Sequence, residues 1–174
     1  YLTVYDQHRL HDLVAGIPYD QICILVNNDR YAGGGIYNFF AAFTVDSEEA
    51  EFLFHHEFGH AFAGLADEYY TSSVAYTDIF DLQAEPYQPN ITTRVQFEKK
   101  WIDMIPDSVP VPTPDTIMYA GVVGLFEGAS YYAKGVFRPS LDCSMRSITH
   151  DAFCPVCKKA IEQMIYFNGY KREE

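Results

Sequence analysis

The chain has little positive charge and no long apolar run. Among its 174 residues, 12 are Lys or Arg and 24 are Asp or Glu, so the formal net charge is −12. Nucleic acids and anionic membranes attract clustered basic residues, and this balance argues against either as a partner. No apolar segment approaches the roughly 18 residues that a transmembrane helix needs, so we expect no membrane insertion.

Internal repeats and low-complexity segments are also absent from the sequence. Hydrophobic residues make up 48% of the chain and aromatic residues 16%, which is typical of a protein that buries a full core. We therefore expect one domain over residues 1–174. The chain begins with Tyr1, inside or close to a helix expected at about 3–15, so we expect that upstream sequence with a signal peptide preceded it.

The order of the expected elements predicts an α+β fold. Apolar periodicity and turn residues divide the chain into recognisable segments. We expect strands at 21–27, 35–43, 118–126 and 130–137, helices at 3–15, 47–63, 93–105 and 155–167, and a long loop at 69–92. The first helix would place Leu2, Leu10, Leu13 and Val14 in the core, and the first strand would bury Cys23.

Residues 47–63 carry the signals of a helix with a defined start and stop. Ser47 is the expected N-cap, and acidic residues follow it where the helix dipole favours negative charge. Gly64 is the expected stop, because glycine accepts the left-handed conformation of a helix C-terminus.

Within this helix, residues 56–60 read H-E-F-G-H. His56 and His60 project from the same face, about 40° and roughly 6 Å apart, so both imidazoles can bind one metal ion. Zinc prefers nitrogen ligands in tetrahedral geometry. Glu57 flanks the metal face, where it can act as general base toward a metal-bound water. The motif therefore predicts a zinc (Zn2+) peptidase site.

A catalytic zinc usually has three protein ligands and one open position, so a third ligand must come from elsewhere. Asp67 is the nearest candidate, and Glu68 is the alternative. In a continued helix Asp67 would lie about 16 Å along the axis from His56, which is too far. A chain reversal at Gly64 would bring the carboxylate back toward the metal.

The segment from His56 to Tyr69 resembles the active-site segment of the IgA peptidase family of zinc metallopeptidases, relatives of the metzincins. One residue more than in metzincins separates His60 from Gly64, and an Asp replaces their usual third His. The resemblance implies a zincin-like fold, in which a small twisted mixed sheet packs on helices. It also implies zinc-dependent hydrolysis of peptide bonds, with immunoglobulin A as one candidate substrate.

The resemblance extends to two further segments. Residues 141–147 are similar to the family's Met-turn, in which Met145 would form an apolar floor beneath the zinc histidines. The strand before the active-site helix binds substrate in metzincin-like enzymes, by adding an extended peptide to a sheet edge. This implies substrate binding at Gly35, Ile36 and Tyr37.

Three of the four cysteines cluster near the C-terminus. We expect one disulfide from Cys143 to either Cys154 or Cys157, because an exported protein permits it. A structural zinc site made of these cysteines and His150, or a reduced and merely packed cluster, are the alternatives.

Together these features predict a secreted or cell-surface zinc-dependent endopeptidase that acts on proteins or peptides. Glu57 would activate a water held by His56, His60 and Asp67 through zinc. The alternative is a non-catalytic binding module or adhesin on a zincin scaffold, although such a binder has no need of Glu57.

Overall fold

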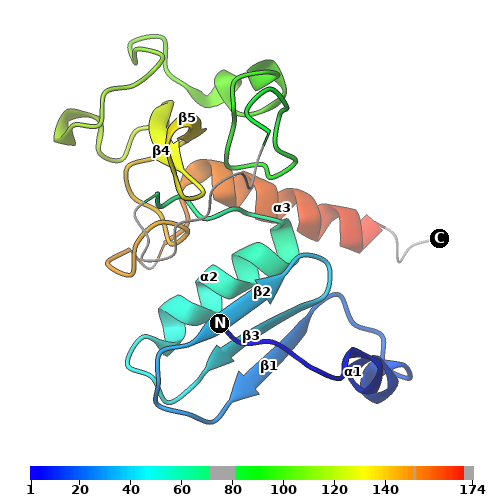
Figure 1. Cartoon of the computed structure of the whole chain (residues 1–174). Helices are drawn as coiled ribbons and strands as arrows, with labels where there is room; N and C mark the ends of the chain where they lie inside the picture. Colours follow the sequence, from blue (N-terminus) through cyan, green and yellow to red (C-terminus); the bar gives the residue numbers. More distant parts are fainter. Residues whose placement is uncertain (71–80, 151, 171–174) are drawn as a thin grey trace. The chain divides into compact units, whose positions relative to one another are not determined.

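The computed structural model describes residues 1–70, 81–150 and 152–170 and has a mixed α+β fold with small sheets and helices (Figure 1). By their internal contacts the residues form two compact units, Tyr1–Gly64 with the chain from Met164 onward, and Leu65–Gln163. The α+β class is thereby confirmed, whereas the single domain stays a prediction. None of the helices in the described ranges combines the length and apolarity that crossing a bilayer requires.

The first unit is built on a three-stranded mixed sheet in the order β1-β3-β2 (Figure 1). β1 (Ile22–Val26) runs parallel to β3 (Phe40–Thr44), and β2 (Gly33–Ile36) runs antiparallel to β3. Helix α2 (Ala50–Ala63) packs on β2 and β3, whose small or aromatic residues form a buried floor beneath it. The apolar side chains of Ile22, Phe40 and Ala42 form a core cluster with residues from the N-terminal segment and α1 (Gln7–Val14).

Several expectations for this unit were wrong. The expected strand at 35–43 is two strands, because the chain reverses after Ile36 through Asn38, whose φ of 57° lies in the left-handed region that asparagine tolerates. Cys23 is exposed, because β1 is an edge strand and only its face with Ile22 and Ile24 packs on the core cluster. Leu13 is also exposed, while Leu10 and Val14 do pack on the core cluster.

Helix α2 begins later than expected. Its N-cap is Glu49, without a side-chain capping bond, because the Ser47 hydroxyl donates instead to the Glu49 carboxylate at 2.8 Å. The expected stop is confirmed: Gly64 has a φ of 62° and donates its N–H to the His60 carbonyl at 3.1 Å.

The second unit contains an antiparallel hairpin of β4 (Phe126–Ala129) and β5 (Tyr132–Arg138). The final helix, α3 (Pro155–Tyr170), begins within this unit, at the expected residue. The strand expected at 118–126 is wrong, because Ile117–Tyr119 form a 3-10 turn and pairing starts only at Phe126.

The helix expected at 93–105 is replaced by two 3-10 turns, Phe97–Lys99 and Ile102–Met104. Arg94 has a φ of 71°, which no helix interior allows, and Lys100 has a non-helical conformation between the two turns. The Lys100 ammonium donates to the carbonyls of Pro86 and Gln88 at 2.5 and 2.7 Å. These tertiary contacts override the helical spacing. Of the loop expected at 69–92, residues 71–80 lie outside the described residues.

Candidate active site

The two motif histidines of α2 converge on one point. The Nε2 atoms of His56 and His60 lie 3.1 Å apart, and the two rings are nearly perpendicular, with centroids 4.6 Å apart. Two nitrogens bound to one tetrahedral zinc at 2.0–2.1 Å would be separated by about 3.4 Å. His56 is 8% exposed and stacks on Phe52, which restricts its ring. The pair therefore has the spacing of two ligands to one ion.

The general-base candidate Glu57 is buried beside strand β2. Its carboxylate occupies the space where a side chain on Gly33 would lie: a Cβ there would be 2.7 Å from the Glu57 Cδ and 2.8 Å from the Cγ. Only glycine at position 33 therefore leaves room for this carboxylate, and the sheet and helix place it together.

The predicted substrate strand packs equally tightly on α2. A Cβ on Gly35 would lie 2.7 Å from the His60 Cβ and would overlap the Glu57 carbonyl. β2 is an edge strand, and its Gly33 carbonyl accepts the Leu2 N–H at 2.8 Å. Ile36 ends the strand, and Tyr37 lies in the turn beyond it, where its ring packs against Gly64.

In the second unit, Asp67 is held by the turn between β4 and β5. The Tyr131 hydroxyl donates to the Asp67 Oδ2 at 2.8 Å, and the Ser130 N–H donates to the Asp67 carbonyl at 3.0 Å. Both turn residues have positive φ, 49° at Ser130 and 70° at Tyr131, an uncommon conformation that often marks functional sites. The Tyr69 hydroxyl lies 2.9 Å from that of Tyr131, and burial, together with the Asp67 charge, raises the pKa of Tyr69.

Glu68 has a different environment from its neighbour Asp67. Its side chain is fully buried, its Oε1 accepts the Asn90 amide at 3.0 Å, and the Cys157 thiol lies 3.2 Å from the same oxygen. Burial raises the pKa of the Glu68 carboxyl. The Glu68 backbone N–H donates to the carbonyl of Met145 at 2.8 Å. Met145 is itself fully buried, within a tight turn of the chain.

A comparison with protein families gives a match along most of the chain. The family described as IgA Peptidase M64 matches residues 1–117 and 115–165. The chain belongs to this family. A search of curated proteins finds no match.

Membership in the IgA Peptidase M64 family, a family of metallopeptidases, makes the protein a peptidase whose substrates are proteins or peptides. The resemblance inferred from the motif segment is thereby confirmed. The structure supplies candidate metal-binding groups in the residues it describes. The Nε2 atoms of His56 and His60 are close enough to bind the same metal ion, as expected of a metallopeptidase.

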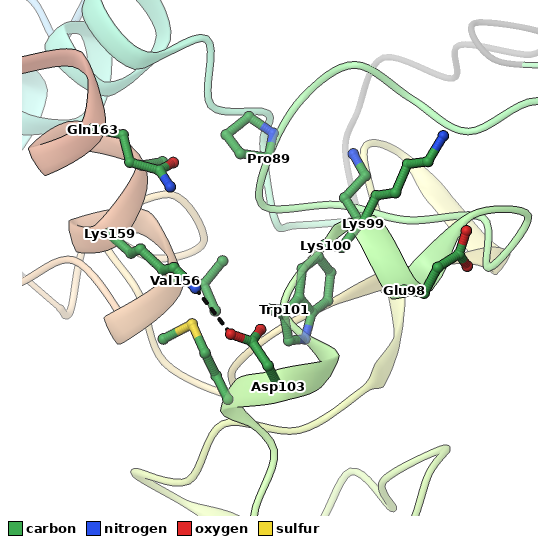
Figure 2. A pocket seen from close by; sticks show the side chains of 11 residues that line it. Pro89, Glu98, Lys99, Lys100, Trp101, Asp103, Val156, Lys159 and Gln163 are labelled. Atoms are coloured by element: carbon green, nitrogen blue, oxygen red, sulfur yellow. Dashed lines mark hydrogen bonds and ion pairs between the residues drawn. The ribbon is translucent and has the colours of Figure 1, made fainter. Parts of the chain in front are cut away.

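Two hollows of the second unit are large enough for a side chain. One, of about 320 Å³, is lined by Tyr69, Tyr70, Asp142, Arg146 and Ser147. The other, of about 330 Å³, lies between the 3-10 turns and the start of α3 (Figure 2). There Lys159 forms an ion pair with Asp103 at 3.2 Å.

The motif identified the α2 residues, but sequence analysis missed three residues that contact Glu57, Asp67 or Glu68. Gly33 had no sequence signal that linked it to the motif, whereas it makes room for Glu57. Tyr131 was one of several tyrosines without a distinguishing signal, and only its position in the turn brings it to Asp67. Asn90 had no signal at all, although it donates to Glu68 and to the Ala66 carbonyl.

Proposed function

We propose that the protein is a zinc-dependent endopeptidase in which His56, His60 and Asp67 hold the ion and Glu57 is the general base. The convergence of the two Nε2 atoms at 3.1 Å on one face of α2 carries this proposal. Zinc, when bound there, would polarise the scissile carbonyl and make water a stronger nucleophile near neutral pH.

Glu57 performs the proton transfers of the proposed reaction. Its carboxylate takes a proton from the attacking water and passes it to the leaving amine, so no covalent intermediate with the protein forms. The residue is 8% exposed, which leaves its carboxylate little access to bulk water. Close packing against Gly33 limits the positions that the carboxylate can adopt.

Asp67 is preferred to Glu68 as the third ligand for two reasons. Glu68 is engaged by Asn90 and Cys157 in a separate buried cluster, away from the role of a third ligand to the α2 histidines. The Tyr131 hydroxyl also donates to one Asp67 oxygen, as groups behind metal-binding carboxylates commonly do, and so fixes the carboxylate's orientation. We assign Tyr131 as a positioning residue and Met145 as the apolar floor of the site.

The substrate is proposed to be an extended protein segment, added to the free edge of β2. The Ala32 carbonyl faces β3, where it accepts the Thr44 N–H at 3.1 Å, so the backbone groups of Gly33 and Gly35 face the other edge. The Leu2 N–H donates to the Gly33 carbonyl, so we place the substrate on the outer edge at Gly35, beside Ile36 and Tyr37. Immunoglobulin A is one candidate, and an extracytoplasmic location would follow from such substrates.

Metal removal and Asp67→Asn test the proposal together. A chelator should abolish cleavage of a protein panel that includes immunoglobulin A, and zinc should restore it. Asp67→Asn should lower zinc affinity by about 10-fold or more, because the amide is a poorer ligand. Asp103→Asn, which changes an exposed carboxylate paired with Lys159, is the matched control and should keep full activity.

Chelator-resistant cleavage, or unchanged metal affinity in Asp67→Asn, would contradict the proposal. If zinc binds but nothing is cleaved by wild type, the alternative of a binding module on a peptidase scaffold is favoured.

A further inference from the structure

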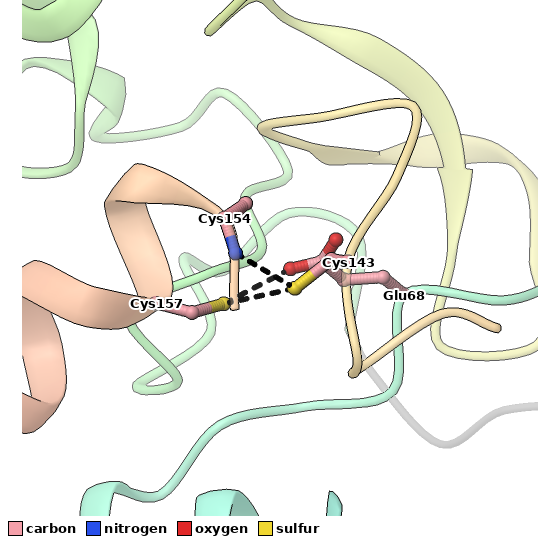
Figure 3. A group of neighbouring side chains, drawn as sticks. All are labelled: Glu68, Cys143, Cys154 and Cys157. Carbon is pink, nitrogen blue, oxygen red and sulfur yellow. Dashed lines mark hydrogen bonds between the residues drawn. The ribbon is translucent and has the colours of Figure 1, made fainter. Parts of the chain in front are cut away.

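Four metal-binding side chains of the second unit gather in one buried cluster, which we call the cysteine cluster (Figure 3). It consists of Glu68, Cys143, Cys154 and Cys157. One ligand atom from each lies within 4.8 Å of all the others, and every one of these residues is buried. They come from three separate segments: the chain after Gly64, the turn that carries Met145, and the start of α3.

The separations match those of ligands around one tetrahedral zinc ion. The sulfur atoms of Cys143 and Cys157 are 3.7 Å apart, and the Cys157 sulfur is 3.2 Å from the Glu68 Oε1. Zinc–sulfur distances of about 2.3 Å and zinc–oxygen distances of about 2.1 Å would give separations of about 3.8 and 3.6 Å. Bonded sulfurs in a disulfide would be about 2.0 Å apart.

Backbone groups beside Cys143 and Cys154 can stabilise anionic sulfur. The Cys143 sulfur accepts the backbone N–H groups of Cys154 at 3.3 Å and Met145 at 3.5 Å. Cys154 directly precedes the first residue of α3, where the helix dipole favours negative charge.

The Glu68 carboxylate supplies an independent indication. It is fully buried and points toward the three cysteines (Figure 3), and its Oε2 has no hydrogen-bond partner among the described residues. An unpaired buried oxygen of this kind is costly unless an ion binds the carboxylate.

We propose that Glu68, Cys143, Cys154 and Cys157 bind a structural zinc ion, separate from the one held by the α2 histidines. Four protein ligands leave no open position, so the site is closed to substrate and its role is structural. Binding releases thiol protons to solvent and involves no oxidation or reduction. The ion would tie the segment that carries Asp67 to the turn of Met145 and to α3.

Cobalt substitution tests the site in the whole chain, with the metal ion alone as the probe. Reduced protein is stripped of metal and titrated with Co(II), and sulfur-to-cobalt charge-transfer absorption is recorded in the near ultraviolet. Wild type should show this band together with the visible ligand-field absorption of tetrahedral Co(II). Cys157→Ser, which leaves two of the three thiolates, should weaken it, whereas Cys23→Ser, which changes the exposed cysteine, should keep it at full intensity.

This readout does not depend on the proposed function, because His56, His60 and Asp67 offer no sulfur ligand. His60→Ala should therefore weaken peptidase activity and leave the charge-transfer band in place. Absence of the band in folded wild type would overturn the structural zinc site even if the peptidase proposal held.

A thiol count on the purified protein distinguishes a zinc-bound cluster from a disulfide and from a reduced, merely packed group. This measurement needs no variant. Denatured protein with chelator should give four reactive thiols, the full number of cysteines, together with released zinc. One disulfide would leave two of the four thiols, without cluster zinc, and would overturn the proposal in favour of the predicted bond. Four thiols with no cluster zinc would overturn it in favour of a merely packed group.

Discussion

Gly33→Ala should disable Glu57 without unfolding the protein. The new methyl group would lie 2.7 Å from the Glu57 Cδ, whereas unbonded carbons prefer about 3.5–4.0 Å, so the carboxylate must move by about 1 Å. A misplacement of this size can cost about 10²-fold in rate, or about 3 kcal/mol of transition-state stabilisation. Because a side-chain rotation relieves the overlap, the folding cost should stay near 1 kcal/mol.

The assay compares kcat/KM on a protein substrate with Tm and zinc content for wild type and variant. Gly16→Ala is the matched control, since a Cβ there meets nothing within 4 Å, and it should behave as wild type. Full activity in Gly33→Ala would show that the Glu57 position in this structure has no catalytic importance. A large fall in Tm would show that the overlap is not relieved by the side chain.

Three further changes separate stability from chemistry. Gly35→Ala should lower both activity and the free energy of unfolding, the latter by about 1–3 kcal/mol in denaturant titration, because its methyl meets backbone that cannot rotate away. Tyr131→Phe should lower kcat by about 10-fold and leave Tm nearly unchanged, since Asp67 loses one orienting hydrogen bond; unchanged kinetics would refute this role. Trp101→Phe should lower stability by about 1–3 kcal/mol without affecting Glu57-dependent kinetics, because the buried Gly124 carbonyl loses its indole donor at 2.8 Å.

The parts of the molecule that short-range chemistry determines could be predicted from the sequence. The H-E-F-G-H spacing placed His56 and His60 on one helix face, and Gly64 ends that helix in the left-handed conformation expected of it. The start of α3 after Cys154 was also predicted, because Pro155 suits a first helical position.

The remaining features depend on contacts between distant residues, which no local pattern records. Glu68 lies with cysteines that follow it by 75 to 89 positions, so the sequence predicted a disulfide among them, with a zinc site that included His150 as an alternative. The His150 Nε2 lies 3.0 Å from the Asp142 carboxylate. Helical spacing at 93–105 was likewise overruled by the hydrogen bonds that the half-buried Lys100 donates to the carbonyls of Pro86 and Gln88.

The measurement that tests the account most directly is cleavage of a mixed protein panel, including immunoglobulin A, by wild type and Glu57→Gln at equal zinc content. Glutamine keeps the size of the side chain but cannot accept the proton from water, so Tm should change little. We expect cleavage by wild type and a loss of about 10²-fold or more in the variant. Equal cleavage by both proteins would contradict the assignment of Glu57 as the general base.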